Sequence, residues 1–198
     1  PAPLAFREQL PTLCVLLRGA LYPSLVMGKE IEMRTGKCPD YALFRVRRSH
    51  SDKENLEYLL DQSYHDPAKL KGKHLIFPDT MLATAGSLIA VYTMLVKEGV
   101  KPDHVDFFGI IGSFEGAINA LRAIPSLTLY LAWIDPVLNH KGYILPGLGD
   151  AGDLLNGSAE NITDLLKGYG SEFCRVHVRQ IEKVYDAMKQ TVAEEVFD

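Results

Sequence analysis

The chain has 198 residues, of which 47% are hydrophobic and 23% are charged, and its formal net charge is −4. This composition predicts one globular domain with a sizeable core, and the acidic balance argues against a nucleic-acid binder, because surfaces that follow phosphate backbones are normally basic. No apolar run approaches the roughly 20 residues of a membrane span, and the chain does not open on a signal-peptide pattern. We therefore expect a cytoplasmic protein with no membrane partner.

Short apolar strands alternate with helical patterns from the start of the chain. Residues 13–17 form a continuous apolar run that ends at Arg18, and a helical pattern runs from 21 to about 33. A second strand is predicted over 41–46. The polar segment 47–67 has too much charge and too little periodicity for core, and it predicts a protruding hairpin or arm.

The same alternation continues through the middle of the chain. Strands are predicted over 73–77, 105–111 and 127–134, with helices following residue 87 and over 114–123. This rhythm predicts an α/β fold, a mostly parallel sheet with helices on both faces. A further helical stretch over 172–196 either packs on this domain or makes a coiled or interdomain contact.

A phosphate-binding turn is predicted between the strand over 73–77 and the helix that follows it. The connecting residues offer one acid, two hydroxyls and small side chains, namely Asp79, Thr80, Met81, Leu82, Ala83, Thr84, Ala85, Gly86 and Ser87. A helix that begins this way has backbone N–H groups without internal partners and a partial positive charge, which together favour an anion.

Other polar side chains also follow predicted strands. Arg18, Arg48 and Glu115 do so, and ligands in parallel sheets sit beyond the carboxyl ends of strands. Arg48 belongs to a basic cluster with Arg45 and Arg47 that could equally be a solvated strand edge.

A glycine-rich segment over 142–153 is the second candidate site. Its Gly147, Gly149 and Gly152 match the spacing of the dinucleotide fingerprint, but Pro146 precedes them and no crossover helix fits behind them. Either a flat ring approaches the bare backbone here, or the segment is a structural turn.

The cysteines and histidines indicate no disulfide framework, zinc site or catalytic triad. Cys14, Cys38 and Cys174 lie far apart and are expected to be buried thiols. The six histidines, His74 and His140 among them, are expected at the surface or as satisfied core residues.

These motifs resemble those of uracil phosphoribosyltransferases. Residues 79–87 are similar to that family's phosphoribosyl-pyrophosphate loop, usually Asp-Pro-Met-Leu-Ala-Thr-Gly-Gly-Ser, and residues 17–21 are similar to its Leu-Arg-Ala-Gly-Leu pyrophosphate loop. Residues 134–153 resemble its uracil-binding hood. The resemblance implies a type I phosphoribosyltransferase fold: one domain over 1–198 with a core over about 13–158, a hood near 135–158 and an extra C-terminal helical extension over about 160–198.

The resemblance also implies an activity, the transfer of a phosphoribosyl group to uracil, giving UMP and pyrophosphate, with Mg²⁺ carried by the donor and no direct protein ligand. Arg18, Asp79 and Asp150 would be catalytic. The residues implied to bind substrate are Arg18, Arg48, Asp79, Thr80, Met81, Leu82, Ala83, Thr84, Ala85, Gly86, Ser87, Tyr143, Ile144, Gly149, Asp150 and Ala151. We expect a homo-oligomer, and the resemblance leaves open whether GTP is an effector.

Two departures leave a second function open. Ala85 replaces a glycine of the family's loop, which costs roughly 1–2 kcal/mol if that position needs a positive φ and nothing otherwise. Just after the hood, Leu154 and Asn156 stand where the family usually shows a basic residue and a phenylalanine. The chain is therefore either an active pyrimidine-salvage enzyme or a catalytically silent domain of the same fold that regulates or assembles a larger protein.

Overall fold

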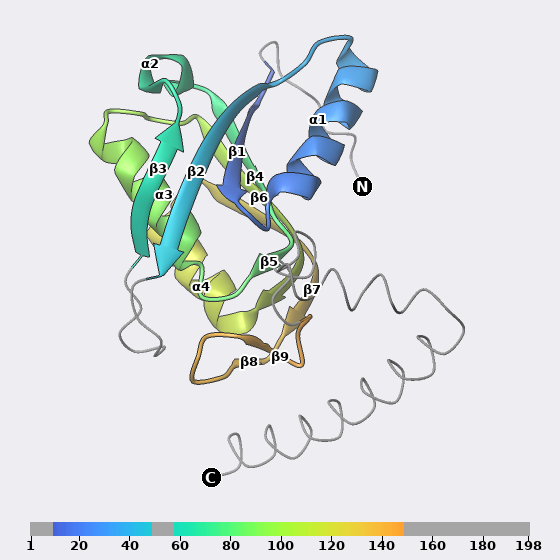
Figure 1. Ribbon diagram of the computed structural model, residues 1–198, viewed down its shortest axis with the longest axis vertical. Coiled ribbons are helices and arrows are strands. Elements are labelled where there is room, and N and C mark those ends of the chain that lie inside the picture. Colours follow the sequence, from blue (N-terminus) through green and yellow to red (C-terminus); the bar gives the residue numbers. More distant parts are fainter. Residues whose placement is uncertain (1–9, 49–57, 149–198) are drawn as a thin grey trace, which may run out of the picture.

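The computed structural model describes residues 10–48 and 58–148 (Figure 1). The strands are β1 (Thr12–Leu17), β2 (Asp40–Arg48), β3 (Tyr58–Tyr64), β4 (His74–Pro78), β5 (Met81–Leu82), β6 (His104–Ser113), β7 (Leu127–Asp135), β8 (Val137–Leu138) and β9 (Ile144–Leu145). The helices are α1 (Leu21–Thr35), α2 (Pro67–Leu70), α3 (Gly86–Lys97) and α4 (Phe114–Ala123).

The main sheet is parallel except at one edge. Its strands lie in the order β3, β2, β1, β4, β6, and β7 pairs with the free side of β6. β5 continues beside β6 where β4 ends, since Pro78 pairs with Phe108 and Met81 pairs with Ile111. Only β3 runs antiparallel, because it returns from β2 as a hairpin. The carboxyl ends of β1, β4 and β6 therefore meet at one edge of the sheet.

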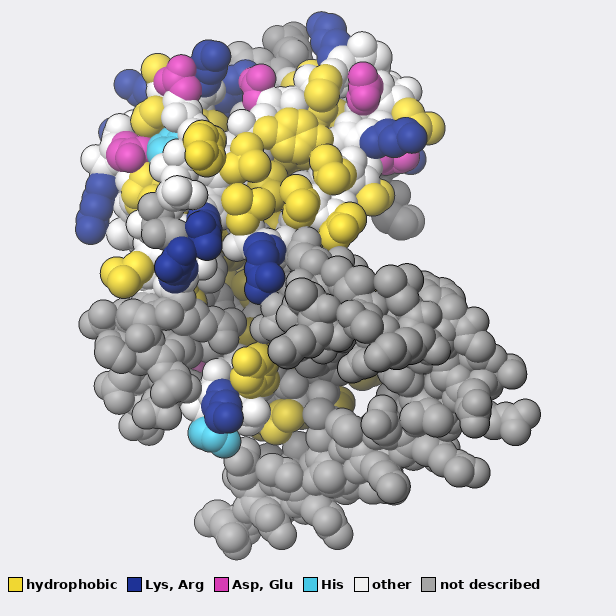
Figure 2. Space-filling view, in the orientation of Figure 1, with side chains coloured by type: hydrophobic (Ala, Val, Ile, Leu, Met, Phe, Trp, Pro, Cys, Tyr) yellow, Lys and Arg dark blue, Asp and Glu magenta, His cyan; other side chains and the backbone are white. Residues whose placement is uncertain are grey.

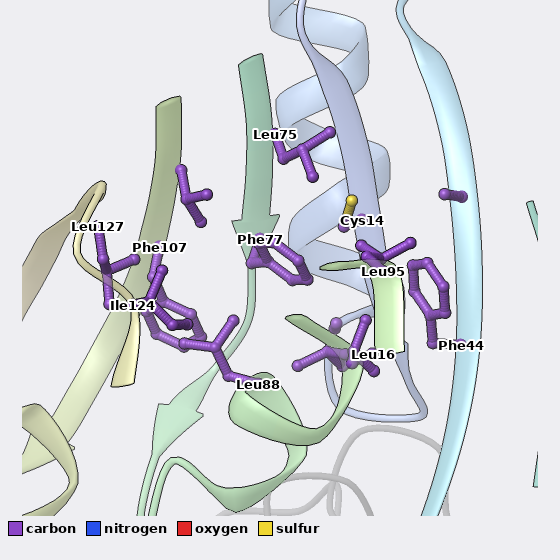
Figure 3. Packing of buried hydrophobic residues seen from close by; sticks show 14 of the residues in the cluster. Cys14, Leu16, Phe44, Leu75, Phe77, Leu88, Leu95, Phe107, Ile124 and Leu127 are labelled. Carbon is purple, nitrogen blue, oxygen red and sulfur yellow. The ribbon is translucent and has the colours of Figure 1, made fainter. Parts of the chain in front are cut away.

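Helices cover both faces of this sheet, as the sequence predicts. Side chains of α3 and α4 pack with alternate residues of the strands in the main core, where Phe44, Phe77 and Phe107 are fully buried (Figure 3). On the opposite face, Ile31 of α1 packs with Leu13 and Ile76. Successive strand residues point to opposite faces, so each central strand contributes to both cores.

Two expectations from the sequence need correction. β3, at the end of the segment over 47–67, pairs antiparallel with β2 as in a hairpin, but Leu60 of β3 packs against the main core, so the described part of this segment is not purely peripheral. Cys14 is buried, and burial raises the pKa of its thiol, whereas Cys38 is exposed in the connection between α1 and β2. Cys174 and the helix expected over 172–196 lie outside the described residues.

The face that carries α1 has an exposed hydrophobic surface. Figure 2 shows hydrophobic side chains gathered over α1 and the neighbouring strands β1 and β2. Exposed members include Leu25, Val26 and Tyr22 of α1 and Tyr41 of β2. Within the described part of the chain, no helix has the length and apolar character needed to cross a membrane.

Candidate active site

Two loops meet at the carboxyl edge of the sheet. Arg18 and Gly19 follow β1, and Asp79 and Thr80 follow β4. A Cβ on Gly19 would lie 3.2 Å from Oδ1 of Asp79 and 3.3 Å from Oγ1 of Thr80, which is tighter than most real contacts. The glycine therefore lets the two loops approach each other. The peptide bond between Leu17 and Arg18, just before this glycine, is cis.

The loop after β4 is held to β6 by its backbone. The amide of Asp79 donates to the carbonyl of Phe108 over 2.8 Å. The amides of Ile110 and Ile111 both donate to the carbonyl of Thr80, over 3.1 and 3.2 Å. These bonds fix the Asp79 side chain at the sheet edge without using its carboxylate.

The turn that the sequence predicts to bind phosphate lies at the start of α3. Ala85 precedes the helix with φ +64°, and its own side chain offers the helix no capping hydrogen bond. Oγ1 of Thr84 accepts a bond from the Gly86 amide over 3.3 Å. The first-turn amides and the helix dipole thus face a hydroxyl-lined turn, which is suited to an anion.

Ala85 has a backbone conformation in the left-handed region. Of the two alternatives that the sequence left open for this residue, the structure therefore shows the positive φ. Its φ of +64° means that the Cβ carries a cost of roughly 1–2 kcal/mol relative to glycine. Ala85 is 5% exposed and belongs to the main core. Burying a methyl-sized group stabilises the folded state by about 0.8 kcal/mol. Part of the strain is thereby offset, and the loop keeps its shape with alanine in place.

Tyr58 is a site residue that the sequence did not indicate. Its hydroxyl hydrogen-bonds with Oγ1 of Thr84, and its ring lies where a Cβ on Gly86 would be. Tyr58 comes from β3, in the segment that the sequence predicts as a peripheral hairpin. Across the hairpin, Tyr58 pairs with Arg48, the last residue of β2. The backbone of Arg48 therefore lies next to Tyr58.

Ser113 is a second residue that sequence reasoning missed. Its Oγ donates to the carbonyl of Ala83 over 2.6 Å and accepts from the amide of Gly116 over 2.8 Å. The same hydroxyl therefore caps α4 and holds the loop over 79–87. A serine before a helix is a recognisable cap, but nothing in the sequence says which loop the capping hydroxyl also contacts.

Replacing Ser113 with alanine should weaken this loop. The loss of the cap costs about 0.5–2 kcal/mol of stability, and the Ala83 carbonyl loses its side-chain donor. We expect a lower thermal midpoint together with weaker binding of a sugar-phosphate ligand. Thr35→Ala is the matched control, because its hydroxyl bonds to the Ile31 carbonyl at the far end of α1. Equal ligand affinity in Ser113→Ala and in the parent would contradict the positioning role.

Asp79 has an unusual acidity for a carboxyl group. Burial raises its pKa to about 7, although the amide and hydroxyl of Thr80 and the amide of Met81 donate to the carboxylate and oppose the rise. The amide of Thr80 lies 2.7 Å from Oδ1. A carboxyl group that changes charge near neutral pH at the wall of a cavity is a candidate functional residue.

The hood candidate is a short hairpin, β8 and β9, that Asp135 supports. Oδ2 of Asp135 accepts from the amide of Gly147 over 2.9 Å, and Oδ1 accepts from the Trp133 indole over 2.9 Å. Ile144 is 5% exposed and packs with Ile111 and Leu138. The hairpin is thereby fixed to the ends of β6 and β7.

A cavity of about 420 Å³ joins the predicted elements. Arg18, every residue over 79–87, Tyr58 and Tyr143 line it, and Tyr143 comes from the hood hairpin. Phosphate turn and hood therefore share one cavity. Ile144 and Glu115 do not line it. Gly149, Asp150 and Ala151 lie outside the described residues, and so does the side chain of Arg48.

A mostly parallel α/β sheet with a turn suited to an anion and an acidic residue at its carboxyl edge has the ligand-site arrangement of an open α/β protein. A family model described as uracil phosphoribosyltransferase matches residues 38–157, which is more than half of the chain. The chain belongs to the uracil phosphoribosyltransferase family.

Individual relatives agree with this assignment. The chain is 37% identical over 148 residues to uracil phosphoribosyltransferase 1 of Schizosaccharomyces pombe, covering 71% of this chain and 67% of that protein. It is 40% identical over 113 residues to a uracil phosphoribosyltransferase of Agrobacterium fabrum, covering 57% and 51%. The AQ2163 protein of Aquifex aeolicus has a similar fold, with TM-score 0.61 and 28% identity over 73% of this chain and 64% of that one. The chain thus spans about half the length of several relatives that it matches.

Proposed function

We propose that the chain transfers the phosphoribosyl group of phosphoribosyl pyrophosphate to uracil, giving UMP and pyrophosphate. The observation that carries this proposal is the single cavity lined by the loop over 79–87, by Arg18 and by Tyr143 of the hood hairpin. A donor and a planar acceptor have to meet in one cavity for group transfer. Membership of the family supports the choice of uracil as the acceptor.

The chain's own groups account for donor binding. The uncapped first turn of α3, with Thr84 and Ser87, binds the 5′-phosphate, and the Asp79 carboxylate accepts hydrogen bonds from the ribose hydroxyls. Arg18, exposed beside Gly19, stabilises the pyrophosphate as it gains charge on leaving. Catalysis then consists mainly of positioning and charge stabilisation, and it needs no nucleophilic side chain.

The acceptor side of the cavity is the hood. Tyr143 lines the cavity, and the backbone after β9 continues toward Gly149, Asp150 and Ala151, which we propose read the polar edge of the pyrimidine together with Ile144. Ile144 acts through its backbone in this proposal, because its side chain is buried against Ile111 and Leu138.

Mg²⁺ is proposed to arrive with the donor. Among the described residues that line the cavity, Asp79 is the single carboxylate, which is too few for a protein-made Mg²⁺ cage. This donor set fits an ion held mostly by pyrophosphate oxygens and water, with Asp79 and the Thr80 hydroxyl beside it. The ion would neutralise the leaving group.

The test is a turnover assay with the whole chain, labelled uracil, phosphoribosyl pyrophosphate and Mg²⁺. We expect labelled UMP, formed only when the donor is present. Binding of both substrates without product would instead identify a catalytically silent domain. A result in which cytosine, adenine or hypoxanthine competes with labelled uracil as well as unlabelled uracil does would contradict uracil as the acceptor. That result would leave the transfer reaction standing. A homo-oligomer, a GTP effector, a cytoplasmic location and the one-domain boundaries all stay predictions.

A further inference from the structure

Three side chains that the proposed reaction does not use converge at the opposite edge of the sheet. His74 and His104 are the first residues of β4 and β6, and they pair with each other in the parallel register. Asp106 lies two residues along β6, on the same face as His104. One ligand atom from each of the three lies within 4.8 Å of the others.

The carboxylate of Asp106 is buried between the two rings. Asp106 is 2% exposed, and Oδ2 lies 2.9 Å from Nε2 of His74 in a hydrogen bond. Oδ1 lies 2.9 Å from Nε2 of His104, yet it has no hydrogen-bond partner with acceptable geometry. A buried carboxylate oxygen that accepts no hydrogen bond is costly and therefore uncommon. This oxygen points to a further group between the side chains.

We propose that His74, His104 and Asp106 bind a divalent transition metal ion of the Zn²⁺ type. Two imidazole nitrogens and one carboxylate oxygen are ligands that Zn²⁺ accepts, with water at a fourth position. The ion would complete the coordination of the unpartnered Oδ1. Mg²⁺ and Ca²⁺ prefer oxygen ligands and fit this set poorly.

The surroundings allow an ion to enter. The side chains of His74 and His104 are 28% and 41% exposed, whereas the Asp106 side chain is 3% exposed, so the rings form the entrance and the carboxylate forms the floor. Oγ1 of Thr128 on β7 lies 3.2 Å from Nε2 of His104 in the metal-free protein, and an ion bound at this nitrogen would replace that hydrogen bond. Binding would link β4 and β6.

The site is separate from the candidate active site. His74 begins β4 and Asp79 directly follows this strand, five positions later, which is about 16 Å at roughly 3.3 Å per residue. An ion at the amino ends of the strands cannot reach the phosphate turn at their carboxyl ends. We infer a stabilising ion, and this inference holds whether or not the chain turns over uracil.

The test is calorimetric titration of the whole chain with ZnCl₂, followed by thermal unfolding. We expect one bound Zn²⁺ at this site, and a midpoint raised by roughly 5–10 °C when free Zn²⁺ is 100 times its Kd. MgCl₂ at the same concentration should leave the midpoint unchanged. His104→Asn and Asp106→Asn should each abolish the shift.

Two control variants separate this site from other zinc ligands. His140→Asn removes an exposed histidine outside the cluster, and Cys38→Ser removes the exposed thiol. Both should keep the full Zn²⁺-dependent shift. If Zn²⁺ does not bind the parent, or binds His104→Asn as tightly as the parent, the cluster is a plain His–Asp–His hydrogen-bonded group and the proposal is wrong.

A measurement on the unmodified chain keeps the proposal testable even if a variant fails to fold. Histidine ring signals in NMR spectra, recorded during Zn²⁺ titration, should change at two of the six histidines with one saturation curve. Nuclear Overhauser contacts to Thr128 and Asp106 would identify these as His104 and His74. Changes confined to other histidines would overturn the assignment.

Discussion

Asp79→Asn should reduce kcat/KM for phosphoribosyl pyrophosphate by roughly a hundredfold. The change replaces a carboxylate, which can accept from two ribose hydroxyls, with a neutral amide. A hydrogen bond to a charged group contributes about 1.5–3 kcal/mol, so the loss approaches 3 kcal/mol, or two powers of ten. Release of pyrophosphate measured at several donor concentrations gives the ratio directly.

The fold should tolerate this substitution. Because burial raises the pKa of Asp79 to about 7, the folded protein holds a proton there that the unfolded chain has released above pH 4. The free energy of unfolding therefore falls as the pH rises from about 4 to about 7. An asparagine stays neutral throughout and can still accept the Thr80 amide through Oδ1, so Asp79→Asn should be at least as stable as the parent at pH 8.

The same pKa predicts a pH dependence of donor binding. The charged carboxylate is the form that accepts hydrogen bonds, so kcat/KM for the donor should rise with pH up to about 7 and then level off. The donor's phosphates also titrate near pH 6, and for this reason the parent is compared with Asp79→Asn. Asp40→Asn, an exposed acid at the amino end of β2, is the control. Profiles of identical shape in parent and Asp79→Asn would contradict the role of Asp79.

Arg18→Ala should reduce kcat/KM for the donor nearly as much as Asp79→Asn does. A charge-assisted contact to phosphate contributes about 1.5–3 kcal/mol, so kcat/KM for the donor should fall by about one to two powers of ten. Because the leaving pyrophosphate gains charge in the transition state, the fall should appear in kcat as well as in KM. Steady-state rates over a range of donor concentrations separate the two parameters.

Arg34→Ala is the matched control for Arg18. Arg34 is exposed on the last turn of α1 and pairs with Glu30 one turn earlier, a kind of pair that contributes at most about 0.5 kcal/mol. Its removal should leave turnover unchanged. If Arg18→Ala retains the parent's kcat and KM, the guanidinium does not contact the donor and the pyrophosphate must be bound elsewhere.

The sequence predicts the core elements because their patterns are local. The apolar run over 13–17, the strand before Asp79 and the helices predicted after residues 20, 87 and 113 all carry their own periodicity. Each is present, the second helix beginning at Gly86. The strand–turn–helix pattern also locates the phosphate turn, because backbone amides at a helix start need no particular side chain.

The sequence does not predict which segments that are far apart along the chain come into contact. Tyr58 reaches Thr84 only because the hairpin of β2 and β3 lies beside α3. The charged residues near β3 in the sequence mask the strand pattern, so β3 is not predicted. The second bond of Ser113, to Ala83, depends on the position of β5 next to β6. Similarly, His74 and Asp106 are 32 residues apart, and only the parallel register of β4 and β6 brings them together.

The loop over 79–87 is fastened from two sides, by Tyr58 of the hairpin and by Ser113 at the start of α4. A loop held this way is already shaped for its ligand before binding, so little backbone freedom remains to be lost when a phosphate enters. Association should therefore be fast and should show a small unfavourable entropy from the protein. Removing the Tyr58 hydroxyl, as in Tyr58→Phe, would leave the residues proposed to touch the phosphate in place and still slow its capture.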